Sequence, residues 1–261
     1  ARGNPIVSQG SGNWGTAGTW NGGVPQSGDD VYIQSGHTIT FTGTAAIPIN
    51  SLTITGTLTH AANTTSEANK INLSISGDLT IASGGTINVD GLGYNAGQGP
   101  GAGNNGNRPG GGHGGMGGVR VAGNTPATTY GSITNPVNLG SGGGESKGAG
   151  AVILAVGGVA TIDGAISAVG AYAGQNGAGA GGSIYLTAGS IAGTSTISAN
   201  GGWNNNSDGG SGGGGRIALI ASGTISLNLA NVTAVSGLNG ALPGNGTGRG
   251  GAGTIYIKTS G

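Results

Sequence analysis

The chain has no cysteine among its 261 residues, and only 6% of its residues are charged. Without cysteine, disulfide bonds and thiolate metal sites are excluded. Eight basic and eight acidic side chains give a formal net charge of zero and form no basic stripe. Nucleic acids and anionic membranes are therefore not expected partners, because both are bound through clustered positive charge.

Long apolar segments are also absent. No apolar run approaches the roughly 20 residues that a membrane-spanning helix needs, and no positively charged leader precedes Ala1. We therefore expect no membrane insertion, and an exported protein would already have lost its signal. A composition poor in charge and rich in Gly, Ser, Thr and Asn resembles that of secreted surface proteins, so the expected location is extracellular, either secreted or at the cell surface.

Glycine is abundant, with 65 copies beside 8 prolines, a composition that indicates disorder when it has no period. Here a period is present, because a glycine followed by an alternating apolar strand recurs along the chain. The copies are Gly150–Leu154, Gly182–Leu186, Gly215–Leu219 and Gly253–Ile257. Successive glycines are 32 (182−150), 33 (215−182) and 38 (253−215) residues apart. A repeat of this length, made of strands and turns, predicts a stack of coils.

The alternation within these strands predicts one aliphatic face, since successive side chains of a strand point to opposite faces. That face combines two columns: Val152, Ile184, Ile217 and Ile255, with Leu154, Leu186, Leu219 and Ile257 beside them. We therefore predict an all-β fold, a parallel β-solenoid in which the aliphatic rungs lie over one another at about 4.8 Å between coils.

The predicted organisation is a cap or contact segment at residues 1–30, followed by a single solenoid domain at 31–261. Glycine-rich insertions are expected at about 92–149, 171–182, 202–215 and 238–253. Each of the last three leaves a strand of matching form, so we expect them to emerge from one edge and to form a flange bonded backbone to backbone. Trp14 and Trp20 have two interpretations: they cover the open apolar end of the stack, or they form a sugar-stacking platform.

The pattern resembles secreted bacterial or archaeal surface proteins of the right-handed parallel β-helix type, including adhesins and autotransporter passengers. The opening residues Trp14, Trp20, Pro25 and Asp29–Val31 carry this resemblance, together with the coil starts at Gly181–Leu186 and Gly214–Leu219. The resemblance implies a right-handed β-helix and an extracellular role in attachment, matrix or surface structure. It transfers no catalytic residues.

The candidate contact residues lie at the end of the last repeat and in the flange. The strand with Ile255, Tyr256 and Ile257 is interpreted as the first strand of an uncompleted coil, covered either by another copy or by a segment beyond Gly261. Ile6 and Val7 would then cover the open end of a neighbouring copy. Tyr172 and Trp203 fall in flange loops, where exposed aromatic residues contact another subunit or a glycan.

No catalytic, cofactor or metal site is expected. The best pair of carboxylates, Asp90 with Asp163, is more simply explained by turn-forming aspartates. His37, His60 and His113 have no metal-ligand spacing and are expected at outward or solvent-exposed positions. Two glycine patterns, 101–106 and 246–251, match the dinucleotide fingerprint, but chance matches are expected at this glycine content.

The leading hypothesis is a non-enzymatic extracellular structural protein whose copies stack end to end into a filament, with the chain itself as partner. The alternative is an adhesin or glycan-binding surface module. A lyase or hydrolase and an ice-binding protein are weaker alternatives. The last rests on threonines that could form an outward hydroxyl array in the first coils only: Thr38, Thr40, Thr42, Thr53, Thr55, Thr57 and Thr59.

Overall fold

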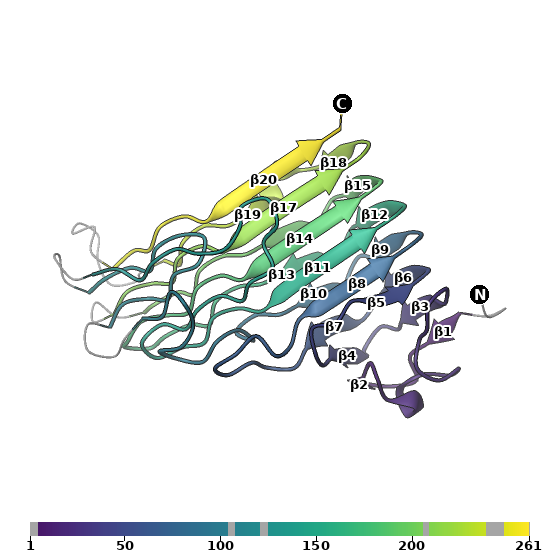
Figure 1. The fold of residues 1–261 in the computed structure, drawn as a ribbon, viewed down its shortest axis with the longest axis horizontal. Coiled ribbons are helices and arrows are strands. Elements are labelled where there is room, and N and C mark those ends of the chain that lie inside the picture. The colour runs from purple at the N-terminus through teal and green to yellow at the C-terminus, as the bar shows by residue number, and fades with distance from the viewer. Residues whose placement is uncertain (1–4, 104–107, 121–124, 206–208, 239–247, 261) are drawn as a thin grey trace.

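The computed structural model describes residues 5–103, 108–120, 125–205, 209–238 and 248–260. Its strands form three sheets in which every named pair is parallel (Figure 1). Sheet 1 contains β1 (Ile6–Val7), β3 (Asp30–Ile33), β6 (Ser51–Ile54), β9 (Leu79–Ile81), β12 (Val159–Ile162), β15 (Ser190–Gly193) and β18 (Ile225–Leu227).

The other two sheets have the same construction. Sheet 2 contains β2 (Gly12–Asn13), β4 (Thr38–Phe41), β7 (Thr57–His60), β10 (Thr86–Asn88), β13 (Ala165–Ser167), β16 (Thr196–Ser198) and β19 (Val232–Thr233). Sheet 3 contains β5 (Ile47–Ile49), β8 (Ile71–Ile75), β11 (Ala151–Val156), β14 (Ser183–Ala188), β17 (Arg216–Ala221) and β20 (Thr254–Thr259). Two short 3₁₀ turns are η1 (Ala17–Thr19) and η2 (Leu229–Asn231).

The chain visits sheets 1, 2 and 3 in turn, and each strand pairs with its counterpart one coil later. The fold is therefore a right-handed parallel β-helix, as predicted. Strands β1 and β2 add a partial coil before the first full one.

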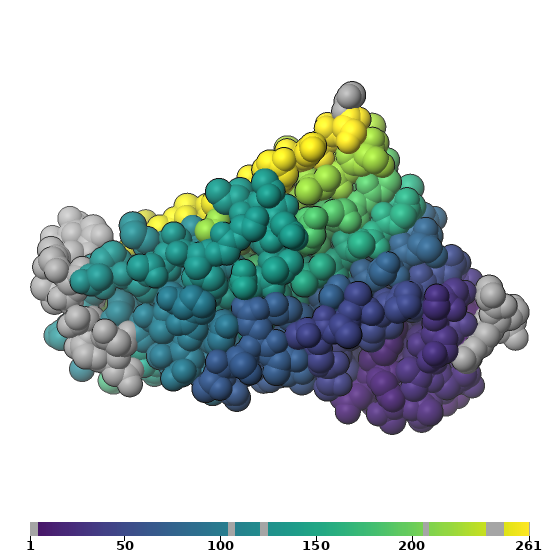
Figure 2. All heavy atoms as spheres, viewed as in Figure 1, coloured from purple at the N-terminus to yellow at the C-terminus, as the bar shows by residue number. Residues whose placement is uncertain are grey.

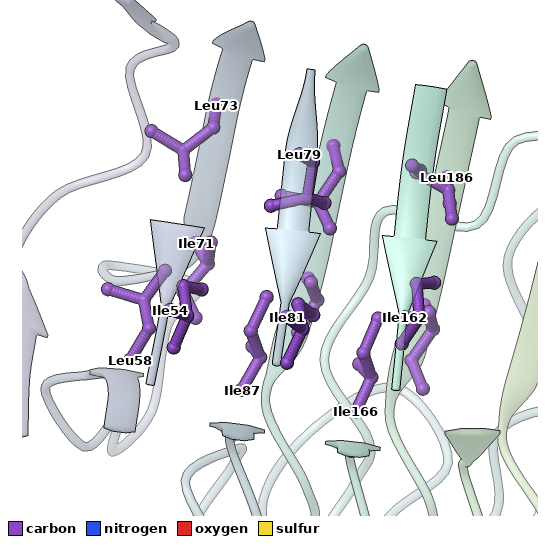
Figure 3. Packing of buried hydrophobic residues seen from close by; sticks show 14 of the residues in the cluster. Ile54, Leu58, Ile71, Leu73, Leu79, Ile81, Ile87, Ile162, Ile166 and Leu186 are labelled. Atoms are coloured by element: carbon purple, nitrogen blue, oxygen red, sulfur yellow. The ribbon is translucent and has the colours of Figure 1, made fainter. Parts of the chain in front are cut away.

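The aliphatic ladder predicted from the repeats is confirmed by the strand register. Ile184 pairs with Val152 in the preceding coil and with Ile217 in the following coil. Leu186 lies in the same way between Leu154 and Leu219. The side chains of Leu186, Ile162 and Ile166 point into the interior shared by the sheets (Figure 3). Each is fully buried, so the core is continuous along the stack.

The long glycine-rich insertions all occur at the same corner of the coil. They connect β10 to β11, β13 to β14, β16 to β17 and β19 to β20, so each leaves sheet 2 and returns to sheet 3 (Figure 1). Parts of the expected insertions, at 104–107, 121–124, 206–208 and 239–247, lie outside the described residues. The described parts extend beside the coils on one side of the molecule.

Backbone hydrogen bonds join the described parts of these insertions into layers. The amide of Gly212 donates to the carbonyl of Gly202, at 3.0 Å, and the amide of Gly202 donates to Gly179, at 2.7 Å. A Cβ atom at Gly179 would collide with the carbonyl of Lys147 in the adjacent segment. Glycine is therefore required at this position because the neighbouring backbones approach too closely for a side chain.

The N-terminal segment belongs to the solenoid itself. Ile6 pairs with Val31 in sheet 1 and is 2% exposed, and strand β2 pairs with β4 in sheet 2. Ile6, which was expected to cover a neighbouring copy, thus completes the first rung of the molecule's own core, because parallel pairing with β3 buries it.

Candidate functional site

The two tryptophans of the N-terminal segment close the apolar interior at that end. Trp14 and Trp20 are each 3% exposed, and their rings meet edge to face with centroids 5.1 Å apart. The Trp14 ring also packs against Phe41, at 4.5 Å. Trp20 Nε1 donates a hydrogen bond to the Trp14 carbonyl, at 2.9 Å. Both residues lie in the core rather than on the surface, so the geometry favours a cap over a sugar-stacking platform.

Beside this cap lies an apolar hollow of about 400 Å³. Its lining includes Trp14, Val24, Pro25, Phe41 and Ile47. The indole nitrogen of Trp14 is buried and has no hydrogen-bond partner among the described residues. The apolar lining of the hollow suits an apolar group.

The opposite end of the solenoid is open. Ile255 is 43% exposed and Ile257 is 39% exposed, although Ile255 pairs with the fully buried Ile217. Tyr256 faces the other side of the strand and is half-buried. Figure 2 shows β20, in yellow, along this edge of the molecule. As expected from the sequence, β20 continues the series of coil-start strands β11, β14 and β17, and among the named strands it pairs with β17 alone.

The flange carries the predicted aromatic residues as a pair. Tyr172 is 52% exposed and Trp203 is 47% exposed, and their ring centroids lie 6.0 Å apart in an edge-to-face arrangement. The neighbouring bridge between Ala173 and Asn204 places the two rings on successive coils. Asn204 then donates to the carbonyl of Leu238, at 3.0 Å, which brings Leu238 beside Trp203. Leu238 is 61% exposed and was not foreseen from the sequence.

These three residues, Tyr172, Trp203 and Leu238, form a strip across three coils that we call the aromatic strip. Polar groups border it. The carboxylate of Glu145 accepts hydrogen bonds from the amides of Gln175, at 3.0 Å, and Asn176, at 2.7 Å. These two bonds lower the pKa of Glu145 and keep it ionised.

The two acids considered as a catalytic pair lie apart. The Asp90 carboxylate accepts hydrogen bonds from Ser167 Oγ, in the last residue of β13, and from the Val169 amide just beyond it, both at 2.6 Å. Asp163 precedes β13 and accepts from the amide of Thr194, at 3.2 Å. Each carboxylate thus joins two coils at opposite ends of one strand, which is a structural role.

No group of three or more potential metal-ligating side chains occurs within the described ranges. The glycine patterns at 101–106 and 246–251 lie partly outside those ranges.

Two of the three histidines are buried, contrary to expectation. His60 is 1% exposed, and its Nε2 accepts a hydrogen bond from the amide of Ala151, at 3.3 Å. His113 is fully buried, and its Nδ1 lies 2.9 Å from the carbonyl of Gly181. His60 is buried because it occupies an inward position of β7, on the same face as Leu58, whereas His113 is buried within the long insertion. His37 is half-buried and hydrogen-bonds to Ser8 Oγ, at 2.8 Å.

His113 belongs to a buried polar cluster that fixes the long insertion to sheet 3. Its ring packs against Tyr130, with centroids 4.8 Å apart. Arg216, at the start of β17, is 5% exposed and donates from Nε to the Tyr130 carbonyl, at 2.8 Å. Its Nη1 donates to Thr254 Oγ1 of β20, at 3.0 Å. Burial lowers the pKa of His113 to about 4, so the ring is neutral at physiological pH.

Comparison with known proteins adds one similarity. A model of the G8 domain matches residues 19–88, a region that runs from η1 to β10 and covers well under half of the chain. G8 domains occur in extracellular and secreted proteins, in agreement with the location expected from composition. No curated protein and no solved structure matches the chain. In the part of the chain that the structure describes, no helix is long and apolar enough to span a membrane.

Proposed function

We propose that the chain is a non-enzymatic structural protein of a bacterial or archaeal surface or matrix, and that its copies stack end to end. The observation that carries this proposal is the half-exposed aliphatic rung formed by Ile255 and Ile257. These side chains continue the buried column of Ile217 and Leu219, so another coil placed over them would bury them. The G8 similarity supports the extracellular setting.

In the proposed assembly, the two ends of the solenoid meet in a head-to-tail contact. Strands β18, β19 and β20 are the edge strands of the three sheets at one end, and β1, β2 and β5 are the edge strands at the other. Unpaired strand edges are templates for pairing with another chain, and β18, β19 and β20 supply them at the C-terminal end. At the N-terminal end, β1 and β2 are already bonded to the cap, since the amides of Asn21 and Thr16 donate to the carbonyls of Val7 and Asn13. The neighbouring copy would therefore meet the cap and β5 there. The apolar hollow beside Trp14 offers a second place for aliphatic contact. A head-to-tail contact repeated from copy to copy gives a ring if its rotation closes and an open filament if it does not. The proposed assembly is the open filament.

Electron microscopy and sedimentation of the purified chain test this assembly. We expect threads whose formation is lost in Ile257→Glu, because that substitution places a charge in the stacking rung. The matched control is Lys258→Glu, which introduces the same side chain one residue away on the outer face of β20 and should still assemble. Isolated monomers at high concentration, or equal loss in both variants, would contradict end-to-end stacking.

A second candidate function is glycan binding by the aromatic strip. Exposed aromatic rings beside fixed carboxylate and amide groups are suited to sugars, which present both apolar faces and hydroxyl groups. The Tyr172–Trp203 pair and the carboxylate of Glu145 supply these elements on one side of the flange.

A glycan array decides between contact with a subunit and contact with a sugar. If the strip binds glycans, the chain should select particular glycans and Trp203→Ala should lose them. Leu229→Ala is the control, since Leu229 is 50% exposed in η2, away from the strip. An array without selective hits would remove this candidate and leave the stacking proposal untouched.

A further inference from the structure

The outer face of sheet 2 carries two columns of small uncharged side chains. The strand register aligns the first column as Thr38, Thr57, Thr86, Ala165 and Thr196. The second column comprises Asn13, Thr40, Thr59, Asn88, Ser167, Ser198 and Thr233. Neither column contains a charged, aromatic or large aliphatic residue, and the one carboxylate bonded to them is that of Asp90, which accepts from Ser167 and Asn88 at the edge of the second column. The columns run along the whole stack and not only along its first coils.

This extent corrects the sequence-based expectation. The array was expected to stop after the first coils and to include Thr53 and Thr55. Thr53 belongs to β6, and Thr55 follows that strand, so neither contributes to sheet 2. The chain passes from sheet 1 to sheet 2 at Gly56, and the array continues with Thr57 and Thr59 on β7.

The columns stand on a rigid frame. Between them, the inward positions of the same strands form a fully buried ladder: Ile39, Leu58, Ile87, Ile166 and Ile197. In such a sheet, successive coils are about 4.8 Å apart, and the columns, two residues apart along each strand, are separated by about 6.6 Å. The side chains therefore form a two-dimensional net with fixed spacings in both directions.

The uniformity of this face is not explained by strand propensity. Strands favour threonine, but they favour aromatic and large β-branched residues equally. The outer face of sheet 3 uses those residues, as Tyr185 on β14 and Ile220 on β17 illustrate. The outer face of sheet 1 includes Asp30, Tyr32 and Val159. Only sheet 2 restricts its described outward positions to small uncharged side chains, so a further constraint acts on that face.

We propose that the outer face of sheet 2 binds the surface of ice. A discrete ligand is held by a few distinct groups that converge in a pocket. The side chains of the two columns repeat in two directions and do not converge on a pocket. They can instead contact a periodic ligand, such as a crystal surface, at every repeat. Ice is uncharged, and its water molecules donate and accept hydrogen bonds at repeats similar to these spacings. The absence of aromatic rings distinguishes this face from one that stacks on the sugar rings of a crystalline polysaccharide.

The chemistry of the side chains fits this ligand. Threonine and serine hydroxyl groups both donate and accept hydrogen bonds, so each can replace a water molecule at the crystal surface. The serine hydroxyls of the second column are already bonded within the protein, since Ser198 Oγ donates to Ser167 Oγ and Ser167 Oγ donates to the Asp90 carboxylate. The threonines therefore supply the proposed contact. Because the buried ladder holds these groups in place, binding to a lattice requires little loss of conformational freedom. The face is independent of the end rungs, so ice binding does not depend on filament formation.

The test is the shape and growth rate of ice crystals in solutions of the protein, measured by nanolitre osmometry and by inhibition of recrystallisation. The wild-type chain should stop crystal growth over a measurable temperature interval and slow recrystallisation. Thr57→Lys places a long charged side chain in the middle of the array and should abolish both effects. Thr80→Lys on sheet 1 is the matched control. Thr80 lies between Thr53 and Thr161 of the adjacent coils. Thr57 has the same setting on sheet 2, between Thr38 and Thr86.

Thermal unfolding monitored by circular dichroism establishes that both variants fold. If Thr57→Lys does not fold, Thr196→Lys at an exposed position of the same column takes its place. The proposal is overturned if the wild-type chain has no effect on ice growth. It is also overturned if Thr80→Lys on sheet 1 reduces the effect on ice growth as much as Thr57→Lys on sheet 2. Sedimentation with crystalline cellulose or chitin supplies a further outcome: binding there that is lost in Thr57→Lys, with ice growth unchanged, would assign the face to a polysaccharide instead.

Discussion

The substitution Leu186→Ala should lower the free energy of unfolding by about 2–5 kcal/mol, which is the range for removing a large aliphatic side chain from a packed core. Leu186 is fully buried and lies between Leu154 and Leu219 in the continuous ladder. Its neighbours above and below are held by parallel strand pairing, so the sheets cannot easily collapse into the cavity. Urea unfolding of the wild type and the variant measures the difference.

Asp163→Ala provides the comparison for this prediction. Asp163 is exposed and accepts hydrogen bonds from the amide and hydroxyl of Thr194. Its loss should cost about 1 kcal/mol, the net value of a hydrogen bond that water can replace. If Asp163→Ala proved more destabilising than Leu186→Ala, the stack would not be held together by its aliphatic core.

Acid should destabilise the protein through His113. The folded-state pKa of this histidine is lowered from 6.5 to about 4 by burial, so between these pH values the unfolded chain binds a proton that the folded chain does not. Stability contributed by the neutral ring is therefore present above about pH 6.5 and is lost as the pH falls toward 4. The difference of about 2.5 between the two pKa values corresponds to roughly 3 kcal/mol at 1.36 kcal/mol per pH unit.

His113→Asn isolates this effect. The asparagine amide can still donate to the Gly181 carbonyl, but it does not titrate. Urea unfolding between pH 7 and pH 4 should show a steeper loss of stability in the wild type than in the variant. The histidine resonances in NMR spectra give the pKa directly. If the wild type and His113→Asn lost stability equally between pH 7 and pH 4, or if the measured pKa of His113 were near 6.5, the cluster around Arg216 would not exclude water.

The coil repeat was predictable because it is local. Each copy of the glycine and apolar strand carries its own alternation, and copies such as Gly182–Leu186 and Gly215–Leu219 give both the period and the buried face. The register follows, since a shift by one residue would turn Ile184 and Leu186 to the outer face. The common corner of the insertions followed from the matching strands that precede them.

The positions that were wrong or missed depend on contacts between distant segments. His113 is surrounded by glycines in the sequence, yet glycine backbones pack so closely in the flange that they bury it. Leu238 becomes the neighbour of Trp203 only through a hydrogen bond between insertions of different coils. Thr53 and Thr57 look equivalent in the sequence, but the turn at Gly56 separates them onto different sheets.

The most direct test of the stacked-coil fold is disulfide formation between introduced cysteines, because the natural chain has none. Thr80 and Thr161 are paired on the outer face of sheet 1 although the long insertion separates them in sequence. Their Cα atoms should be about 4.8 Å apart, within the range for a disulfide, whereas Val159, two residues along the same face, should lie beyond about 7 Å. The double variant Thr80→Cys/Thr161→Cys should therefore form an intramolecular disulfide on mild oxidation, and Thr80→Cys/Val159→Cys should not. Equal or reversed yields would contradict the in-register stacking of coils.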